Sequence, residues 1–321
     1  MSARIIKKAI KRFNRFLISS HINPEGDAIG GQIALASLLR RLGKEVVIVN
    51  ESPVPHILQF MKGTENILKE MPKDFNFQAA IVMDCPDLTR IGKISEYIRE
   101  DSIIINIDHH ISNERFGRYN WSDADTSSTG EMVFELFKAF RLRIGYDEAV
   151  AIYVAIMTDT GSFKYTNTTS RTHRIAAELV DRGVEPYEIF SRIYETNSLQ
   201  DTNLLGESLQ TLKLTDDRKV AWIWVTKDML KRTKASLEGT EGIINFARSI
   251  EGTEIAILFR ETGTEDRIKV SFRSKGRIDV NKLASFFGGG GHVTASGCTV
   301  FGKREEVEKK VLEKAGSMVR T

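Results

Sequence analysis

Side chains that can bind metal ions follow three apolar stretches of this sequence. They are His21 after residues 16–18, Asp84 after residues 79–83, and Asp108, His109 and His110 after residues 103–107. Apolar, largely β-branched runs without turn-forming residues predict strands buried on both faces, as in a parallel sheet. The carboxyl ends of such strands meet at one edge of the sheet, which is where open α/β sheets bind ligands. The pattern therefore predicts a site of carboxylates and imidazoles at this edge.

The loop after the first predicted strand carries His21, Glu25 and Asp27. Pro24 and Gly26 indicate a tight turn, which lets these three side chains converge. An imidazole with carboxylates suits Mn²⁺, Zn²⁺ or Fe²⁺, and a set rich in carboxylates favours Mn²⁺ or Mg²⁺. The alternative is a helix N-terminus, in which Asp27 caps the helix and Glu25 interacts with its dipole. The loop by itself leaves both interpretations open.

Two further carboxylates favour the metal site. Asp84 follows a strand directly, and Asp159 follows the apolar residues 150–157. Alone, each could be an ordinary turn residue. Together with Glu25 and Asp27 they would crowd four negative charges at one edge, which is unfavourable unless cations are present. Two divalent ions could neutralise four carboxylates, and such a pair can activate a bridging water to hydrolyse a phosphate ester.

The adjacent residues His109 and His110 are expected to have different roles. Neighbouring side chains at a strand end point in different directions, so both are not expected to bind the same ion. We expect one imidazole to bind metal and the other to face the substrate. The alternative is a buried, hydrogen-bonded pair with a purely structural role.

A second constellation lies near the C-terminus, where four glycines precede a histidine. Glycine backbone N–H groups can approach an anion closely, and imidazole and guanidinium groups can add charge-assisted hydrogen bonds. The candidate substrate-binding residues are Arg273, Gly289, Gly290, Gly291 and His292. The alternatives are a flexible linker for the glycines and an exposed strand cation for Arg273.

The elements that must position the first constellation alternate in type up to about residue 190. Helices are predicted at 27–39, near 91–98, and at 150–157, 170–183 and 186–195, with a further strand at 45–49. Strands that alternate with helices predict an α/β fold with a doubly wound parallel sheet. We place this domain at residues 1–192.

A smaller α+β domain is expected in the last part of the chain. Residues 198–212 are typical of one long helix of mixed polarity, so we place a connector at residues 193–214. Strands are predicted at 220–225, 254–259 and 267–273, with helices between them. They define a second domain at residues 215–321, which is long enough to form its own core.

Composition limits the class of protein. The 321-residue chain has a net charge of +3, which is too small to indicate a strongly basic protein that covers nucleic acid. The basic amphipathic helix predicted at residues 2–12 lacks the apolar core of a signal peptide, and no segment approaches the ~20 apolar residues of a membrane span. Cys85 and Cys298 predict no disulfide framework. We therefore expect a cytoplasmic protein that does not bind membranes.

Taken together, these motifs resemble those of the DHH phosphoesterase superfamily. The residues that carry the resemblance are His21-x-x-x-Glu25-x-Asp27, Asp84, Asp108-His109-His110, Thr158-Asp159, and a stretch at 288–297 similar to the GGGH motif of the DHH-associated domain. Their order and spacing match over essentially the whole chain. Within the superfamily the small bacterial nanoRNases (oligoribonuclease/pAp phosphatase, NrnA type) are the most similar group, and residues 167–174 also resemble that group.

The resemblance implies a site for two Mn²⁺ ions, with Mg²⁺ or Co²⁺ as substitutes. One ion would be held by His21, Glu25 and Asp84, and the other by Asp27, Asp84, His109 and Asp159. Asp108 would orient His109, and His110 would act on the scissile phosphate as a hydrogen-bond donor or general acid. The family mostly has Asp where this chain has Glu25, so this position departs from the pattern.

The implied function is Mn²⁺-dependent hydrolysis of short single-stranded RNA to mononucleotides and of 3′-phosphoadenosine 5′-phosphate (pAp) to AMP, by a homodimer. A phosphodiesterase of linear or cyclic dinucleotides, such as pApA or cyclic-di-AMP, is the nearest alternative. A RecJ-like exonuclease is disfavoured because no additional oligonucleotide-binding domain is expected, and a family II pyrophosphatase is disfavoured by the glycine–histidine motif. A non-catalytic nucleotide-binding protein is the alternative from a different class.

Overall fold

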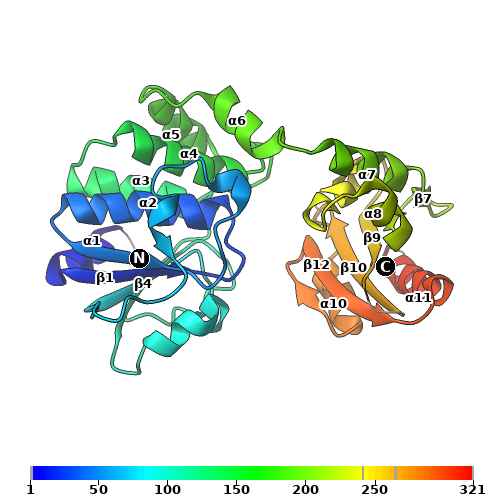
Figure 1. Cartoon of the computed structure of the whole chain (residues 1–321), viewed down its shortest axis with the longest axis horizontal. Coiled ribbons are helices and arrows are strands. Elements are labelled where there is room, and N and C mark those ends of the chain that lie inside the picture. Colours follow the sequence, from blue (N-terminus) through cyan, green and yellow to red (C-terminus); the bar gives the residue numbers. More distant parts are fainter. Residues whose placement is uncertain (1–2, 241, 264–265, 320–321) are drawn as a thin grey trace. The chain divides into compact units, whose positions relative to one another are not determined.

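The computed structural model describes residues 3–240, 242–263 and 266–319. Ser2, the start of the first predicted helix, lies outside the described residues. The chain forms two compact units, Met1–Thr196 and Asn197–Thr321, each with its own sheet and helices (Figure 1). The division falls inside the region that the sequence assigns to a connector.

A six-stranded sheet forms the centre of the first unit, in the order β3-β2-β1-β4-β5-β6, and all its strand pairs are parallel. Its strands are β1 (Arg15–Ser20), β2 (Glu45–Val49), β3 (Ile67–Leu68), β4 (Ala79–Met83), β5 (Ile103–Asp108) and β6 (Tyr119–Ser122). The predicted α/β fold with a parallel sheet is confirmed. The edge strands β3 and β6 were not predicted, because they are too short to show a periodic pattern.

The order of the strands reverses between β1 and β4. β2 and β3 lie beyond β1, whereas β5 and β6 lie beyond β4. In an open α/β sheet such a reversal forms a crevice at the carboxyl ends of the two central strands. The chain leaves β1 at His21 and β4 at Asp84, so these residues stand on the two sides of the reversal.

Helices cover one face of this sheet (Figure 1). They are α1 (Ala3–Arg12), α2 (Gly26–Arg41), α3 (Thr129–Phe140), α4 (Tyr146–Asp159), α5 (Ser170–Val180) and α6 (Pro186–Tyr194), with short 3₁₀ turns η1 (His56–Leu58) and η2 (Thr64–Asn66). Their apolar side chains share one core with inward-facing strand residues such as Phe16, Ile18 and Ile81. The predicted helices around 27–39, 150–157, 170–183 and 186–195 are confirmed, whereas α3 was not predicted.

The opposite face is covered by the 3₁₀ segment η3 (Leu88–Tyr97), which buries Ile91 and Ile94 against Leu17 and Val82. The short helix predicted near 91–98 is present, but it is a 3₁₀ segment interrupted by a kink rather than a regular α-helix. Gly92 breaks the segment with φ 63° and ψ −140°, a conformation that only glycine adopts readily. Apolar spacing alone does not distinguish two short 3₁₀ turns from one α-helix.

Helices α2 and α4 approach each other closely at glycine positions. A Cβ atom on Gly30 would lie 2.2 Å from the backbone carbonyl oxygen of Ala151, and one on Gly26 would lie 2.5 Å from Thr158 Oγ1. Glycine at these positions lets the two backbones meet. Because Asp27 follows Gly26 and Asp159 follows Thr158, this contact fixes the start of α2 beside the end of α4.

The second unit has a mixed sheet in the order β11-β12-β10-β9-β8-β7, with β8 and β9 parallel and the other pairs antiparallel. Its strands are β7 (Lys213–Leu214), β8 (Val220–Val225), β9 (Ile255–Glu261), β10 (Arg267–Ser274), β11 (Gly290–Gly291) and β12 (Ala295–Phe301). Its helices are α7 (Leu199–Leu209), α8 (Lys227–Thr233), η4 (Glu238–Thr240), α9 (Ile243–Ser249), α10 (Val280–Phe286) and α11 (Arg304–Val319). The predicted α+β class is confirmed, with an apolar core on each face of the sheet.

Helix α7 packs within the second unit. Leu204 is fully buried there with Ile223 of β8 and Met229 of α8. From the sequence, we place this helix in a connector at residues 193–214, because its polarity is mixed. The buried leucine gives α7 one apolar side, which covers the sheet.

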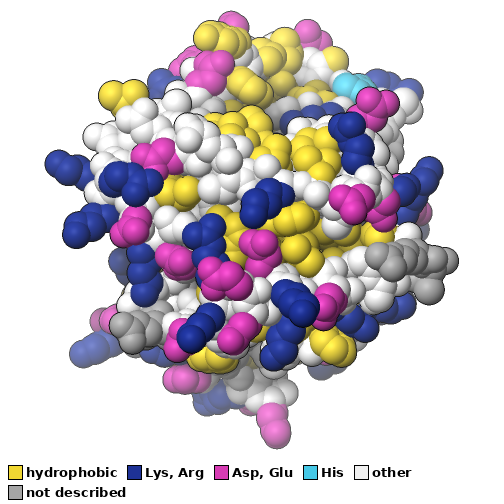
Figure 2. All heavy atoms as spheres, turned by 90° about the vertical axis from the view of Figure 1, so that its right-hand side faces the viewer, with side chains coloured by type: hydrophobic (Ala, Val, Ile, Leu, Met, Phe, Trp, Pro, Cys, Tyr) yellow, Lys and Arg dark blue, Asp and Glu magenta, His cyan; other side chains and the backbone are white. Residues whose placement is uncertain are grey.

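Figure 2 shows one face of the molecule, on which basic and acidic side chains are interspersed and hydrophobic side chains lie between them. This mixture agrees with the small net charge of +3 and shows no basic stripe on that face. Among the described residues, no helix is both long enough and apolar enough to span a bilayer.

Candidate metal centre

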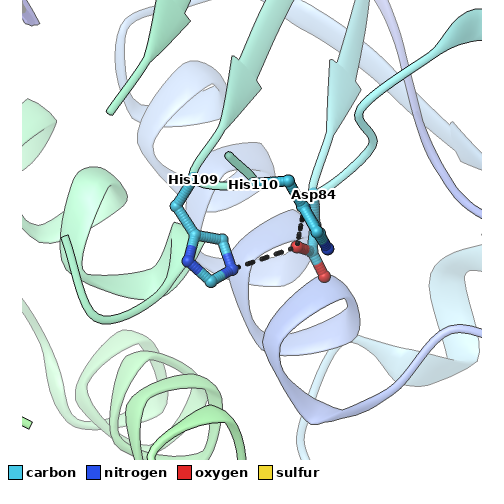
Figure 3. Close-up of side chains that lie close together, drawn as sticks. All are labelled: Asp84, His109 and His110. Carbon is cyan, nitrogen blue, oxygen red and sulfur yellow. Dashed lines mark ion pairs between the residues drawn. The ribbon is translucent and has the colours of Figure 1, made fainter. Parts of the chain in front are cut away.

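The carboxylate of Asp84 lies between two imidazoles at the carboxyl edge of the first sheet (Figure 3). His109 Nε2 is 3.5 Å from Asp84 Oδ1, and His110 Nδ1 is 3.7 Å from the same oxygen. The other oxygen, Oδ2, lies 3.5 Å from His21 Nε2. Asp84, which follows β4, thus contacts residues that follow β1 and β5. The side chains that the sequence predicts at these strand ends are brought together.

His109 also lies among three carboxylates at nearly equal distances. Its Nε2 atom is 3.6 Å from Asp27 Oδ2 and 3.6 Å from Asp159 Oδ2, in addition to its contact with Asp84. Asp27 comes from α2 and Asp159 from the last position of α4. Two groups, Asp84–His109–His110 and Asp27–His109–Asp159, each place their candidate ligand atoms within 4.8 Å of one another. These oxygen and nitrogen donors fit a divalent cation.

The N-terminus of α3 holds Asp27 in place. The backbone N–H of Thr129 donates to Asp27 Oδ2 at 2.7 Å, and that of Gly130 donates to Oδ1 at 2.8 Å. The first N–H groups of a helix have no partner within the helix, so an acceptor from another element satisfies them. Asp27 does not cap its own helix, as the alternative interpretation required, but binds the start of α3.

Asp84 occupies a strained position at the end of β4. Its φ is 50°, in the left-handed region, and its backbone N–H donates to the carbonyl of Ile107 at 3.0 Å. Asp is one of the few residue types other than glycine that adopt this region at moderate cost. The turn directs the side chain back over the end of the sheet, where it meets His21 and His109.

Asp108 contacts a different histidine from the one expected. Its Oδ1 accepts a hydrogen bond from His110 Nδ1 at 2.7 Å, and Oδ2 accepts one from Asn113 Nδ2 at 2.6 Å. The expectation that Asp108 orients His109 is therefore wrong. Side chains at positions i and i+2 of an extended chain lie on the same side, whereas adjacent ones point to opposite sides.

An amide network ties the ends of β4 and β5 together. The buried Asn106 donates through Nδ2 to the carbonyls of Val82 and Cys85, at 3.3 and 3.1 Å, and its Oδ1 accepts from Asn113 Nδ2 at 2.8 Å. Because Asn113 also bonds to Asp108, the network fixes the strand ends that carry the site. Sequence reasoning missed this role. Asn106, a polar residue within an isoleucine run, is the signal that could have indicated it.

Asn167 supports Asp159, and sequence reasoning did not assign it to the site. Its Nδ2 lies 3.1 Å from the carbonyl oxygen of Asp159, 3.3 Å from Asp159 Oδ2 and 2.9 Å from the carbonyl oxygen of Ser127. It therefore connects the end of α4 to the segment that leads into α3. No periodic pattern predicts these contacts, because Ser127 is 40 residues away and the loop between Asp159 and Asn167 is irregular.

Glu25 stands apart from the close groups of ligand atoms. It precedes α2, its side chain is exposed, and it makes no capping hydrogen bond. It belongs to neither group of donors within 4.8 Å, among the residues that the structure describes. Its charge still acts on the site: burial raises the pKa of Asp159, and the neighbouring Glu25 is among the charges that raise it further.

Burial and mutual repulsion govern the charges of the cluster. Burial raises the pKa of Asp27 well above its usual range, and the charges of Asp84 and Asp159 raise it further. Burial likewise raises the pKa of Asp159, to about 6. Burial would also raise the pKa of Asp84, but hydrogen bonds from His109 and His21 outweigh it and lower that pKa. Burial opposes a charge on His109, yet its bond to Asp84 and the surrounding carboxylates raise its pKa to about 10.

The proton on His109 therefore supplies positive charge that the carboxylates require. A divalent ion could supply the same charge, since the donor atoms that surround His109 Nε2 are those that hard and borderline cations prefer. The residues thus fit a metal site on their chemistry and on their proximity.

The glycine run belongs to an ordered edge of the second sheet. Gly290 and Gly291 form β11 and pair with Gly297 and Ser296 of β12. A Cβ atom on Gly289 would lie 2.2 Å from the carbonyl oxygen of Gly297, so a side chain cannot be accommodated there. The alternative interpretation as a flexible linker is therefore wrong.

Arg273 lies near the histidine that ends the glycine run. The turn from His292 to Ala295 is closed by two backbone hydrogen bonds, of 2.7 and 3.2 Å. Arg273 is at the end of β10, directly opposite Ala295 in the sheet register. The structure thus places Arg273 and His292 at one edge of the second unit.

The first unit is an α/β domain whose parallel sheet carries a cluster of carboxylates and histidines where the strand order reverses, and this cluster is a candidate metal site. Residues 15–158 match the DHH family, N-terminal domain, and residues 230–321 match the DHHA1 domain. The bifunctional oligoribonuclease and PAP phosphatase NrnA of Thermus thermophilus is 30% identical over 299 residues, which cover 92% of this chain and 87% of that protein. The protein of the same name from Bacillus subtilis is 28% identical over 303 residues, 92% of each chain. The chain belongs to the DHH family of phosphoesterases, which are hydrolases.

Solved structures agree with this assignment. An exopolyphosphatase-related protein from Bacteroides fragilis has a TM-score of 0.90 and 30% identity, and the match covers 99% of this chain and 97% of that chain. RecJ from Thermus thermophilus in complex with Mn²⁺ has a TM-score of 0.53 and 14% identity, covering 99% of this chain and 54% of that chain. The second likeness shows the fold alone.

Proposed function

We propose that this protein is a metal-dependent phosphoesterase that releases mononucleotides from short oligoribonucleotides and converts pAp to AMP. The observation that carries the proposal is the position of His109, whose Nε2 lies 3.5–3.6 Å from the carboxylates of Asp27, Asp84 and Asp159. The names of the two NrnA relatives, whose lengths this chain matches almost completely, support the class of substrate.

We assign metal binding to two ions. The proposed ligands are His21, Glu25, Asp27, Asp84, His109 and Asp159. The carboxylate-rich set favours Mn²⁺, with Mg²⁺ or Co²⁺ as substitutes. Such ions, when bound, supply positive charge to the reacting phosphate and lower the pKa of a water molecule. We assign Asp84 to both ions because its two oxygens face His21 and His109 respectively. Glu25 belongs to neither close group of donor atoms among the described residues, and its assignment rests on the resemblance to the family motif.

We assign His110 to the substrate phosphate. Its Nδ1 donates to Asp108, whose carboxylate is fully buried, so the ring is held in one orientation. A carboxylate behind an imidazole fixes its tautomer and its orientation. His110 is thus suited to donate a hydrogen bond to a phosphate oxygen or a proton to the leaving group. Asp108 acts through His110 as a positioning residue.

The first unit carries the proposed metal centre, and we assign the second unit to substrate binding. We assign Gly289, Gly290, Gly291, Arg273 and His292 to a second phosphate or to the nucleotide backbone. The Arg273 guanidinium and the His292 imidazole are the proposed donors, because the backbone N–H of Gly289 already donates to the carbonyl oxygen of Ala284 at 2.9 Å. The oligoribonuclease name of the relatives supports a preference for short chains.

A substrate panel with excess Mn²⁺ tests this proposal. It would contain a trinucleotide, a chain of about 24 nucleotides, pAp, pApA, cyclic-di-AMP and pyrophosphate, with Asp84→Ala as the matched control. We expect the fastest release of mononucleotide from the trinucleotide, conversion of pAp, and no turnover by the variant. Equal rates on the long and short chains would refute the preference for short substrates. Activity confined to pApA or cyclic-di-AMP would identify a dinucleotide phosphodiesterase with the same metal centre.

A further inference from the structure

Two half-exposed tyrosines lie beside the proposed metal centre. Tyr165 follows Asp159 by one short loop and is 45% exposed, and Tyr194, the last residue of α6, is 40% exposed. Both belong to the first unit. Neither has a role in the metal cluster or in the apolar core. Large aromatic side chains that remain exposed beside an active site are candidates for ligand contact.

The loop between Asp159 and Tyr165 has an unusual backbone. Gly161, Ser162 and Phe163 have φ values of 56°, 59° and 63°, which form three consecutive left-handed residues. This conformation is unfavourable for residues other than glycine, and for a bulky residue it is a clear outlier. The Phe163 ring is fixed by stacking on His173, at 5.5 Å between centroids, and by a tilted contact with Tyr153 at 5.8 Å. Packing therefore maintains the strain immediately after a proposed metal ligand.

The result of this strained turn is the position of the Tyr165 ring. The backbone N–H groups of Lys164 and Tyr165 both donate to the carbonyl of Thr160, so the chain folds back on itself. A Cβ atom on Gly161 would lie only 2.3 Å from Tyr165 Cζ. The phenol ring thus lies directly over the Gly161 backbone, which supports one part of the ring while the remainder stays exposed.

Tyr194 lies near Tyr165 and near Glu25. Burial raises the pKa of Tyr194, its hydrogen bond with Ser162 opposes that rise, and the nearby groups of Tyr165 and Glu25 add to it. Glu25 in turn is close enough to Asp159 to act on its charge. The hydrogen bond to Ser162 ties the second tyrosine to the same strained turn. Tyr165, Tyr194 and Glu25 therefore lie near one another, and Glu25 in turn lies near Asp159.

We propose that Tyr165 and Tyr194 form an aromatic shelf that stacks on the nucleobase of the nucleotide whose phosphate lies at the metal centre. The inference rests on the proposed function, since it needs a substrate with a base. Stacking on tyrosine tolerates every base, because each base has a π-face, and this suits an enzyme that degrades RNA of any sequence. The strained turn sets the shelf at a fixed distance from Asp159.

Substrates with and without a base test the shelf. The pair is pAp and ribose 3,5-bisphosphate, which carries the same two phosphates on the sugar but no base. For Tyr165→Leu and Tyr194→Leu we expect kcat/KM for pAp to fall about tenfold or more, mainly through KM, and kcat/KM for the base-free substrate to change by less than about twofold. Tyr165→Phe and Tyr194→Phe should retain most of the wild-type value because phenylalanine also stacks.

Tyr187→Leu is the matched control. Tyr187 lies on α6 like Tyr194 and is 74% exposed, but it is about two helical turns away. This variant should hydrolyse both substrates like wild type. An equal loss on both substrates in the shelf variants would show that the tyrosines only support the fold or contact another part of the protein. No loss on pAp would overturn the proposal directly.

Binding separates failure of the shelf from failure of the proposed function. If the wild-type protein hydrolyses neither substrate with Mn²⁺, the proposed function is wrong. Calorimetric titration with AMP and with ribose 5-phosphate then tests the shelf alone. Weaker binding of AMP but not of ribose 5-phosphate by both leucine variants would support stacking. Equal affinities in wild type and variants would contradict it.

Discussion

Binding of Mn²⁺ to the metal-free protein is expected to release protons and therefore to strengthen as the pH rises. Burial alone would lower the pKa of His109, but the bond to Asp84 and the charges of Asp27, Asp159 and Asp84 raise it to about 10. An imidazole must be neutral to bind a metal ion. At neutral pH the metal-free His109 is protonated, so metal binding has to displace this proton.

The size of the effect follows from the number of protons. Release of one proton per chain makes the affinity rise about tenfold for each pH unit between about pH 6 and 8. Asp159, whose pKa burial raises to about 6, adds a second proton at the lower end of that range. The slope of log affinity against pH should therefore be at least about one, and steeper near pH 6.

The same shifts determine the stability of the metal-free protein. The folded pKa of His109 lies above its ordinary value of 6.5, so its contribution is fully present below pH 6.5 and is lost as the pH rises through about 10. Asp159 also has a raised pKa, so its contribution is present below 3.8 and is lost as the pH rises through about 6. Mn²⁺ should therefore stabilise the protein more strongly at the higher pH.

Calorimetric titration with Mn²⁺ in buffers of different ionisation enthalpy measures both the affinity and the number of protons released. His109→Gln is the control, because the variant keeps a polar side chain but has no proton to release. We expect its slope of log affinity against pH to be about one unit smaller. An affinity that is constant between about pH 6 and 8, or an unchanged slope in His109→Gln, would refute the reasoning.

Three substitutions test the surroundings of the site. Gly30→Ala should lower the free energy of unfolding of the first unit, measured in urea, by about 1–3 kcal/mol, because the new Cβ would lie 2.2 Å from a backbone carbonyl oxygen. Gly206→Ala, where no atom lies within 4 Å of the new Cβ, should raise the free energy of unfolding of the second unit by about 0.5–1 kcal/mol. Changes of the opposite sign would contradict this reasoning. Asp108→Asn should lower kcat about 10–100-fold and leave the Mn²⁺ affinity unchanged, since Asp108 contacts His110; a parallel loss of affinity by calorimetry would show that it acts through the metal. Asn167→Ala should weaken Mn²⁺ binding about tenfold, because Asp159 loses a hydrogen bond, and unaltered binding would exclude this role.

The strand ends could be predicted from the sequence because their signals are local. Isoleucine-rich runs that stop at Asp84 or Asp108 indicate both the strand and the residue that leaves its end, and parallel pairing then brings the ends together. Asp159 could be predicted because a carboxylate is conspicuous after an apolar helix. The period of the apolar pattern and the rule that ligands bind at the carboxyl edge of a parallel sheet are enough to predict where these residues lie.

Contacts between distant segments could not be predicted in the same way. Asp27 is held by Thr129 and Gly130, which lie in a helix that the sequence pattern did not reveal. Asn167 reaches Asp159 only after the chain has passed through a strained turn. The contact of Asp108 with His110 is local instead, and it follows from the alternation of side-chain direction along an extended chain. Tertiary geometry, rather than composition or period, determines the contacts of Asp27 and Asn167.

The most direct test of the account is mononucleotide release from a trinucleotide as Mn²⁺ is added back to the metal-free protein. We expect no release without metal, and a rise that ends when two ions are bound per chain, as two-metal hydrolysis requires. Asp84→Asn should stay inactive at every Mn²⁺ concentration, because Asp84 lies between His21 and His109. Full activity without metal, or in Asp84→Asn with Mn²⁺, would contradict the assignment of this cluster as the catalytic metal centre.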